Sequence, residues 1–135
     1  MEERRTARIG TVGGLALLTG GTAVVAAAEA ARSVFATLLL GMLTIGMAHA
    51  LLDEIRRQAR RRSTPGWAVS DTVNTALLAT WAAGAVGAAA LAVVPAAVRV
   101  TGLVLALGYA LSCASFILER RRTIAAMVPP EPVGR

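Results

Sequence analysis

The sequence has no lysine, one cysteine and one histidine, and aromatic residues make up 4% of its 135 residues. The single cysteine, Cys113, cannot form a disulfide within the chain. The single histidine, His49, cannot by itself build a zinc site, which needs three or four converging ligands. One histidine and no cysteine pair also leave no nucleophile–base–acid set and no redox motif. We therefore expect no enzymatic activity and no catalytic, cofactor or metal site.

What the chain does contain is four long apolar stretches, over about 9–28, 34–52, 72–94 and 100–118. Hydrophobic residues make up 56% of the sequence and charged residues 16%, which is too apolar for an ordinary soluble domain. Each stretch supplies the roughly 20 residues that a helix needs to cross a hydrocarbon layer of ~30 Å. Backbone groups inside lipid must be paired within their own segment, which favours helices. The sequence therefore predicts an all-α integral membrane protein, with one four-helix transmembrane domain over residues 1–128.

The arginines predict how these helices are oriented. All 14 basic residues are arginine, and the net charge is +6. Apart from Arg32 and Arg99, they lie in the N-terminal arm, in the basic 53–71 segment and after the fourth stretch. The positive-inside rule then places both termini and the 53–71 loop in the cytoplasm. The short connections at 29–33 and 95–99 predict two antiparallel helical hairpins.

The two predicted hairpins resemble each other. Laying the first over the second without a gap brings Glu54 onto Glu119, and Arg56 and Arg57 onto Arg121 and Arg122. This alignment agrees with a degenerate parallel repeat. Any two apolar hairpins that obey the positive-inside rule would align comparably, so both explanations stay open.

Two segments outside the spans carry helix-breaking residues. We expect the second helix to continue into the 53–71 loop and to stop at Ser63-Thr64-Pro65-Gly66. The prolines after Met127 cannot continue a helix, which predicts a mobile tail over 129–135.

Few polar residues lie within the predicted spans, and each is a candidate site because burying an ionisable group in lipid is costly. His49 and Asp53 lie four residues apart near the end of the second span, on one helix face. Asp71 and Asn74 lie near the start of the third span, at a similar predicted depth. The four residues are a candidate polar cluster that could relay protons. The competing interpretation is a boundary histidine that is hydrogen-bonded locally.

Charges also flank the two predicted outer turns. Glu29, Arg32 and Arg99 are candidate outer charges, and Glu29 is expected to pair with Arg32. Such a pair at a membrane boundary needs no ligand to explain it.

The cytoplasmic arginines predict contact with anionic lipid headgroups, at roughly 1 kcal/mol each. A polyanion such as nucleic acid is the other partner that a basic cluster can hold, but no aromatic residues interleave here to stack on bases, which disfavours it. The residues in this set are Arg56, Arg57, Arg60, Arg61, Arg62, Arg120, Arg121 and Arg122.

Small residues at four-residue spacing predict close helix packing, because small side chains let backbones approach each other in lipid. The spacing alone does not say whether the partner helix belongs to the same chain or to another copy. The candidate packing residues are Gly10, Gly14, Gly84, Ala88, Ala92, Ala106 and Ala110.

These features predict a non-enzymatic four-span protein that serves as a structural or accessory subunit of a larger membrane assembly, either a cellular complex or a virion membrane. Its expected partners are the bilayer, anionic lipids, and other membrane subunits or copies of itself. The alternative is a small transporter or channel whose pathway forms in a homo-oligomer. The exclusive use of arginine, with abundant Ala, Gly and Val, suggests the cytoplasmic membrane of a high-GC prokaryote, or a virion membrane derived from one.

Overall fold

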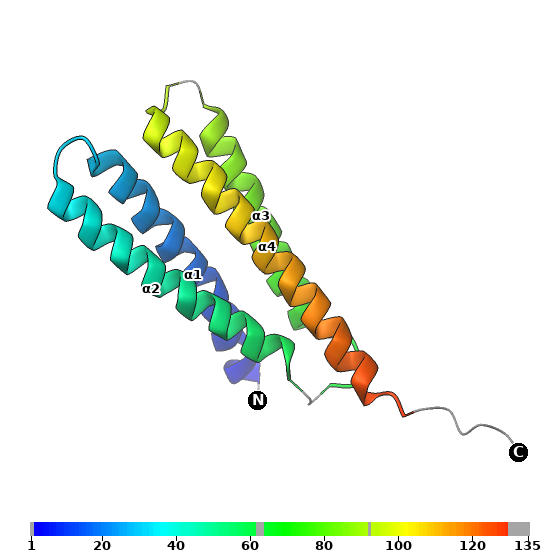
Figure 1. Ribbon diagram of the computed structural model, residues 1–135. Helices are drawn as coiled ribbons and strands as arrows, with labels where there is room; N and C mark the ends of the chain where they lie inside the picture. The colour runs from blue at the N-terminus through cyan, green and yellow to red at the C-terminus, as the bar shows by residue number, and fades with distance from the viewer. Residues whose placement is uncertain (1, 62–63, 92, 130–135) are drawn as a thin grey trace, which may run out of the picture.

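The computed structural model describes residues 2–61, 64–91 and 93–129, and four helices account for most of them (Figure 1). No β-strand occurs within these three ranges. The helices are α1 (Glu2–Glu29), α2 (Val34–Ala59), α3 (Val69–Ala90) and α4 (Ala96–Met127).

All four helices are long and apolar enough to cross a membrane, which confirms that prediction from the sequence. Their ends differ in places from the predicted spans. α3 ends at Ala90, before the predicted end at residue 94, and Pro95 follows as the residue that caps α4. α4 continues to Met127, because the residues after 118 include good helix formers. Apart from Pro129, the tail predicted over 129–135 lies outside the described residues.

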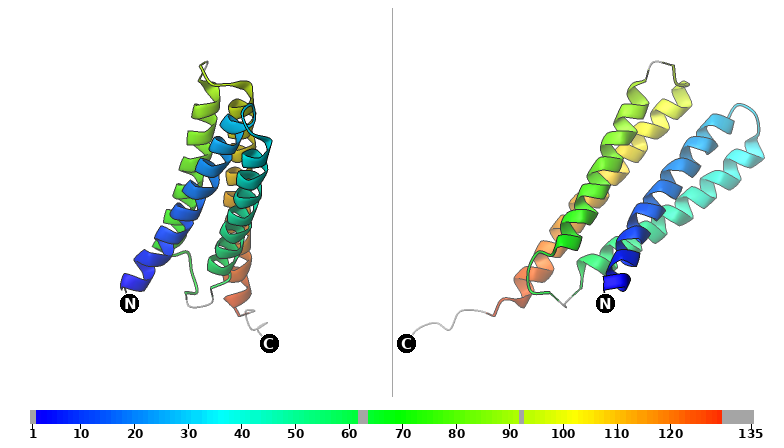
Figure 2. Two further views of the ribbon diagram at one scale, coloured as in Figure 1. Left: turned by 90° about the vertical axis from the view of Figure 1, so that its left-hand side faces the viewer. Right: turned by 180° about the vertical axis from the view of Figure 1, so that it is seen from behind.

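The helices lie side by side as α1 with α2 and α3 with α4, as all three views show (Figures 1 and 2). We call the end of the bundle at which α2 ends and α3 begins the loop end. The opposite end, at which α2 and α4 begin, is called the turn end. Residues 30–33 connect α1 to α2 there, and the Ser33 hydroxyl accepts a hydrogen bond of 3.2 Å from the Ala36 amide, which caps the new helix.

The buried apolar core draws on every helix but is concentrated toward the loop end. On α2 its members all lie in the half of the helix that approaches Ala59, and the preceding half contributes none. The core consists of Val12, Ala16, Leu51, Ile55, Ala59, Leu78, Tyr109 and Phe116.

Small residues allow close approach at two places. A Cβ atom added at Gly102 of α4 would lie 3.1 Å from the Ala89 Cβ and 3.2 Å from the Ala85 carbonyl oxygen of α3. A Cβ added at Gly20 of α1 would lie 2.7 Å from the Tyr109 hydroxyl oxygen. Each glycine is therefore required for the observed distance between its helix and the helix that it faces, which is α3 for Gly102 and α4 for Gly20.

Candidate functional site: a buried polar network at the loop end

Asp71 occupies the first turn of α3 and is fully buried. Its Oδ2 accepts a hydrogen bond of 3.0 Å from the Ala68 amide, so the carboxylate satisfies a backbone donor that the start of a helix leaves free. The same oxygen accepts a bond of 2.9 Å from the Arg120 Nε, and Oδ1 accepts one of 3.2 Å from the Arg61 Nη2. One carboxylate thus joins the end of α2, the start of α3 and α4.

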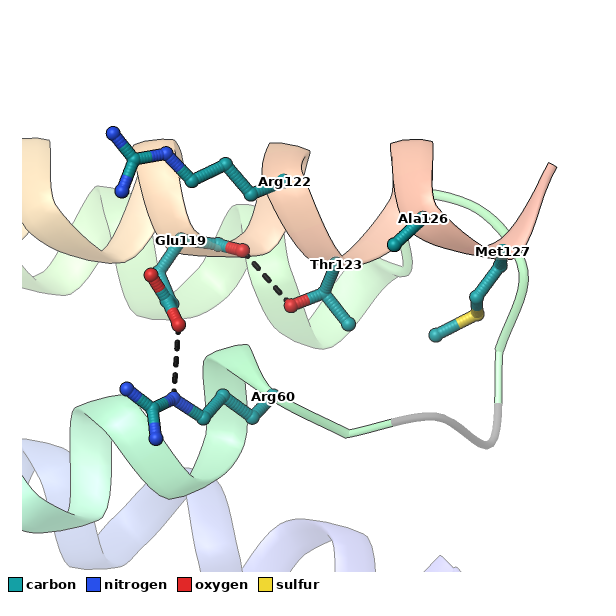
Figure 3. A pocket seen from close by; sticks show the side chains of 6 residues that line it. All are labelled: Arg60, Glu119, Arg122, Thr123, Ala126 and Met127. Atoms are coloured by element: carbon teal, nitrogen blue, oxygen red, sulfur yellow. Dashed lines mark hydrogen bonds and ion pairs between the residues drawn. The ribbon is translucent and has the colours of Figure 1, made fainter.

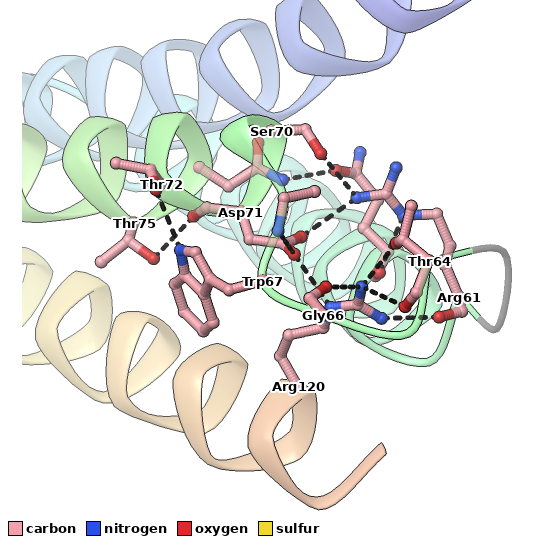
Figure 4. Close-up of polar contacts among 12 residues, drawn as sticks. Arg61, Thr64, Gly66, Trp67, Ser70, Asp71, Thr72, Thr75 and Arg120 are labelled. Carbon is pink, nitrogen blue, oxygen red and sulfur yellow. Dashed lines mark hydrogen bonds and ion pairs between the residues drawn. The ribbon is translucent and has the colours of Figure 1, made fainter. Parts of the chain in front are cut away.

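Arg120 is also fully buried, and its guanidinium is surrounded by acceptors (Figure 4). Nη1 donates to the Arg61 carbonyl oxygen at 2.6 Å. Nη2 donates to the Thr64 hydroxyl at 2.7 Å and to the carbonyl oxygens of Thr64 and Gly66 at 3.2 and 3.0 Å. A guanidinium has donors on all three nitrogens, and here each nitrogen has a protein partner.

This arrangement is suited to holding the connection between α2 and α3 against α4. Both ion-pair partners are withdrawn from solvent, and the remaining donors meet backbone oxygens, which is the condition under which a buried pair is tolerated. Neither charged side chain has exposed surface. The geometry indicates a structural role for this pair.

A second chain of polar contacts lies beside the first. The Asn74 Nδ2 of α3 donates to the Gln58 Oε1 of α2 at 2.6 Å, and the Gln58 Nε2 donates to the Glu54 Oε1 at 2.7 Å. Asn74 and Gln58 are both buried. Within the described residues the Asn74 Oδ1 accepts no hydrogen bond, which leaves one buried acceptor unsatisfied.

The structure places the four members of the predicted polar cluster in three separate sets of contacts. The His49 Nδ1 lies 3.3 Å from the Asp53 Oδ2, and both side chains are largely exposed. Asp71 instead contacts Arg61 and Arg120, and Asn74 contacts Gln58. No hydrogen bond found for the described part of the chain joins His49 or Asp53 to either of the other two.

The candidate outer charges lie at the turn end. Arg32 Nη1 is 3.9 Å from Glu29 Oε1, and the Arg32 side chain is mostly exposed. Arg99 is exposed on the first turn of α4. The three residues therefore present solvent-accessible charges and enclose no site.

The arginines predicted to contact lipid fall into three groups. Arg120 is wholly buried and Arg61 is mostly buried, so neither side chain presents its full guanidinium to a lipid headgroup. Arg60 and Arg57 are exposed and are paired with Glu119 and Glu54, at 2.8 and 3.5 Å. Exposed arginines outside these pairs are Arg56, Arg121 and Arg122, while Arg62 lies outside the described residues.

Most of the candidate packing residues lie on exposed faces of this single chain. Gly10, Gly14, Gly84, Ala88 and Ala110 are exposed, Ala106 is buried, and Ala92 lies outside the described residues. The contact between α3 and α4 is made by a second set of small residues, one position along, in which Ala85 and Ala89 meet Gly102. Exposed small residues remain candidates for contacts with other chains.

Sequence reasoning missed the burial of Arg120 and Gln58. The signal that the sequence offers for Arg120 is its four-residue spacing from Phe116 and Ser112, which puts the three on one face of α4; the structure buries that face. Reading that face would have separated Arg120 from its two neighbouring arginines.

Comparisons of this chain with protein-family models, curated proteins and solved structures found no match.

Proposed function

We propose that this multi-pass membrane protein acts by packing, as a structural or accessory subunit of a larger membrane assembly. The arginines at the loop end support an orientation with both termini and the loop end in the cytoplasm. The arginine-only basic composition supports a cytoplasmic membrane of a high-GC prokaryote, or a virion membrane derived from one.

The observation that carries the proposal is that the four helices are unequally buried within the chain. In the most hydrophobic stretch of α2, 6% of the residues are buried within the chain, against 28% in α1 and in α4 and 17% in α3. The first half of α2 exposes large apolar side chains that each leave more than half of their surface uncovered: Val34, Phe35, Leu38, Leu39, Met42, Leu43 and Ile45.

A transmembrane helix of another subunit, or of a second copy, is the partner that suits this face. Gly46 is exposed among these large side chains, and nothing lies within 4 Å of a Cβ added there. A helix can therefore approach the α2 backbone closely at this point, which is how helices associate in lipid.

The polar groups support a packing role over transport. The chain Glu54–Gln58–Asn74 runs inward from the loop end, and Asn74 is followed one turn later by the fully buried Leu78. Leu78 belongs to the apolar core, so this chain of carboxylate and amide groups ends there.

Gentle detergent extraction followed by native mass spectrometry tests the proposal. The 13.9-kDa chain should emerge with a stoichiometric membrane partner or as a defined multiple of itself. Gly46→Leu should reduce that complex, because the added side chain blocks the close approach. Gly87→Leu is the matched control, since Gly87 is an exposed glycine of α3 with equally open surroundings. A chain that stays monomeric in mild detergent and in lipid nanodiscs would contradict the proposal.

The alternative, a small transporter or channel formed by a homo-oligomer, is favoured by one observation. The unsatisfied Asn74 Oδ1 is a buried acceptor that could bind a proton donor or a cation. Flux of protons or ions through liposomes that contain the purified protein alone, lost in Asn74→Leu, would establish this function and overturn the packing role.

A further inference from the structure

A hollow lies between α2 and α4 at mid-length, with a volume of about 390 Å³, and it is open to the exterior. Residues 44–52 of α2 form one wall, residues 104–115 of α4 form the other, and Thr19 of α1 contributes as well. A second hollow begins at the same Thr44 and Ile45 and continues between α1 and α2 toward the turn end. The two hollows meet at these two residues, so the groove between α2 and α4 continues beside α1 toward the turn end.

The lining of this groove is chemically suited to hydrocarbon. Most of its residues are aliphatic, and its hydroxyl groups are already occupied. Thr44 donates to the Leu40 carbonyl at 2.8 Å, and Ser112 and Ser115 each donate at 2.7 Å to the carbonyl four residues earlier on α4. Thr19 does the same on α1, also at 2.7 Å. Because these donors are satisfied within their helices, the groove presents mainly methyl and methylene groups.

Charged side chains lie at the loop end of the seam between α2 and α4. A polar hollow lies at the loop end (Figure 3). Arg60, which follows the last residue of α2, lines it together with Glu119, Arg122 and Thr123 of α4. Arg60 directly follows α2, eight residues after Leu52. On α4, Ser115 and Glu119 are four residues apart and share a face. At 1.5 Å per residue, Arg122 lies roughly 10 Å along α4 from Ser115.

Of the two arginines in this hollow, one is paired with a carboxylate and the other is available to bind an anion. The Arg60 Nε bonds to the Glu119 Oε1 at 2.8 Å, which partly neutralises both groups. Arg122 is exposed and, in the part of the chain that the structure describes, no carboxylate lies within ion-pair distance of it. A phosphate would therefore meet a net positive charge, and headgroup hydroxyls could donate to Glu119.

We infer that the seam between α2 and α4 is a binding site for an anionic phospholipid, with an acyl chain in the groove and the phosphate at Arg122 and Arg60. An apolar groove that runs toward a basic mouth matches the two parts of such a lipid. The inference rests on the membrane location and orientation proposed above, and it does not depend on the subunit role.

Native mass spectrometry of the full chain in a neutral detergent, with phosphatidylglycerol or phosphatidylcholine of identical acyl chains, tests this site. Phosphatidylglycerol should be retained over phosphatidylcholine. Arg122→Gln should weaken phosphatidylglycerol retention about fivefold, the effect of one arginine at a lipid surface. Arg121→Gln is the matched control, because Arg121 is exposed but does not line the hollow; it should have a smaller effect.

The groove is tested separately by Gly108→Leu, which places a side chain in the hollow where nothing lies within 4 Å of the new Cβ. Retention of phosphatidylglycerol should fall to that of phosphatidylcholine, whereas Gly87→Leu on α3 should leave it unchanged. Equal retention of both lipids by the unaltered chain, or equal effects of the two arginine variants, would overturn the inference. So would a Gly108→Leu variant that loses a second copy of the chain while keeping its lipid, since the groove would then hold a helix. An unaltered chain that retains phosphatidylglycerol but is recovered without any protein partner would count against the subunit role alone.

Discussion

The two ends of the bundle are built differently. At the loop end, Asp71 and Arg120 are fully buried, and their hydrogen bonds link α4 to the start of α3 and to the backbone between α2 and α3. At the turn end, the charged groups Glu29, Arg32 and Arg99 lie on the outside, and no described ion pair joins one pair of helices to the other.

This difference follows from the medium in which the helices lie. Lipid tails are as apolar as leucine, so burial of apolar surface gives helices no hydrophobic reason to associate. Helix pairs must then be held by van der Waals packing and by polar bonds. The loop end has both, and the turn end has the packing of Gly102 against Ala85 and Ala89 within one pair. We therefore expect the loop end to fix how the pairs sit together.

The largest expected effect is that of removing the buried guanidinium. Arg120→Met leaves Asp71 with Arg61 as its remaining ion-pair partner and deprives four other oxygen acceptors of a donor, so the free energy of unfolding should fall by about 3–5 kcal/mol. Loss of helicity on titration of detergent micelles with SDS measures this. Arg121→Met, an exposed neighbour, should change stability by no more than about 0.5 kcal/mol. Similar losses for both variants would show that the network does not hold the loop end.

How much the sequence could predict is clearest at these three adjacent arginines. Apolar length predicted four helices able to cross a membrane, because that property is additive along the chain. Arg120, Arg121 and Arg122 are chemically identical, and their burial depends on which face of α4 meets the other helices. That rotation is set where Phe116 and Tyr109 pack against core residues of the other helices, which are far from the arginines in sequence. The rotation of α3 decides in the same way that Ala85 and Ala89, and not Gly84 and Ala88, meet α4.

A smaller effect is expected where α1 meets α4. The added methyl of Gly20→Ala would lie 2.7 Å from the Tyr109 hydroxyl oxygen, which itself donates to the Ala16 carbonyl. The clash should lower the free energy of unfolding by about 1–3 kcal/mol in the same SDS titration. Gly21→Ala is the control: nothing lies within 4 Å of a Cβ added there, so the free energy of unfolding should change little. Adding Tyr109→Phe to Gly20→Ala should recover part of the loss, and a double variant as unstable as the sum of the two changes would contradict this contact.

Between α3 and α4 the expected effect is smaller again. Gly102→Ala places its Cβ 3.1 Å from the Ala89 Cβ, a distance that small shifts of the helices can relieve. We expect a loss of about 1 kcal/mol, near the lower limit for overpacking. Gly87→Ala, with nothing within 4 Å, is the control on the facing helix. Stabilisation by Gly102→Ala would mean that the two helices are farther apart than described.

The smallest effect should come from the exposed ion pair at the rim of the loop end. Arg60→Gln removes the 2.8 Å contact with Glu119, but the Arg60 side chain is 67% exposed, so the pair should contribute no more than about 1 kcal/mol. The free energy of unfolding at low and high salt measures it, and screening should reduce the difference between Arg60→Gln and the unaltered chain. A loss as large as that of Arg120→Met would remove the distinction between buried and exposed pairs.

The most direct test of the difference between the two ends is a pair of spin-label distance distributions between α2 and α4, measured in nanodiscs in a Cys113→Ala background. Labels at Arg56 and Arg121 report on the loop end, and labels at Phe35 and Val100 report on the turn end; all four side chains are exposed. We predict a narrow distribution at the loop end that broadens in Arg120→Met, and a broader one at the turn end that this substitution leaves unchanged. Equally narrow distributions at both ends, or a loop-end distribution that Arg120→Met does not alter, would contradict the account.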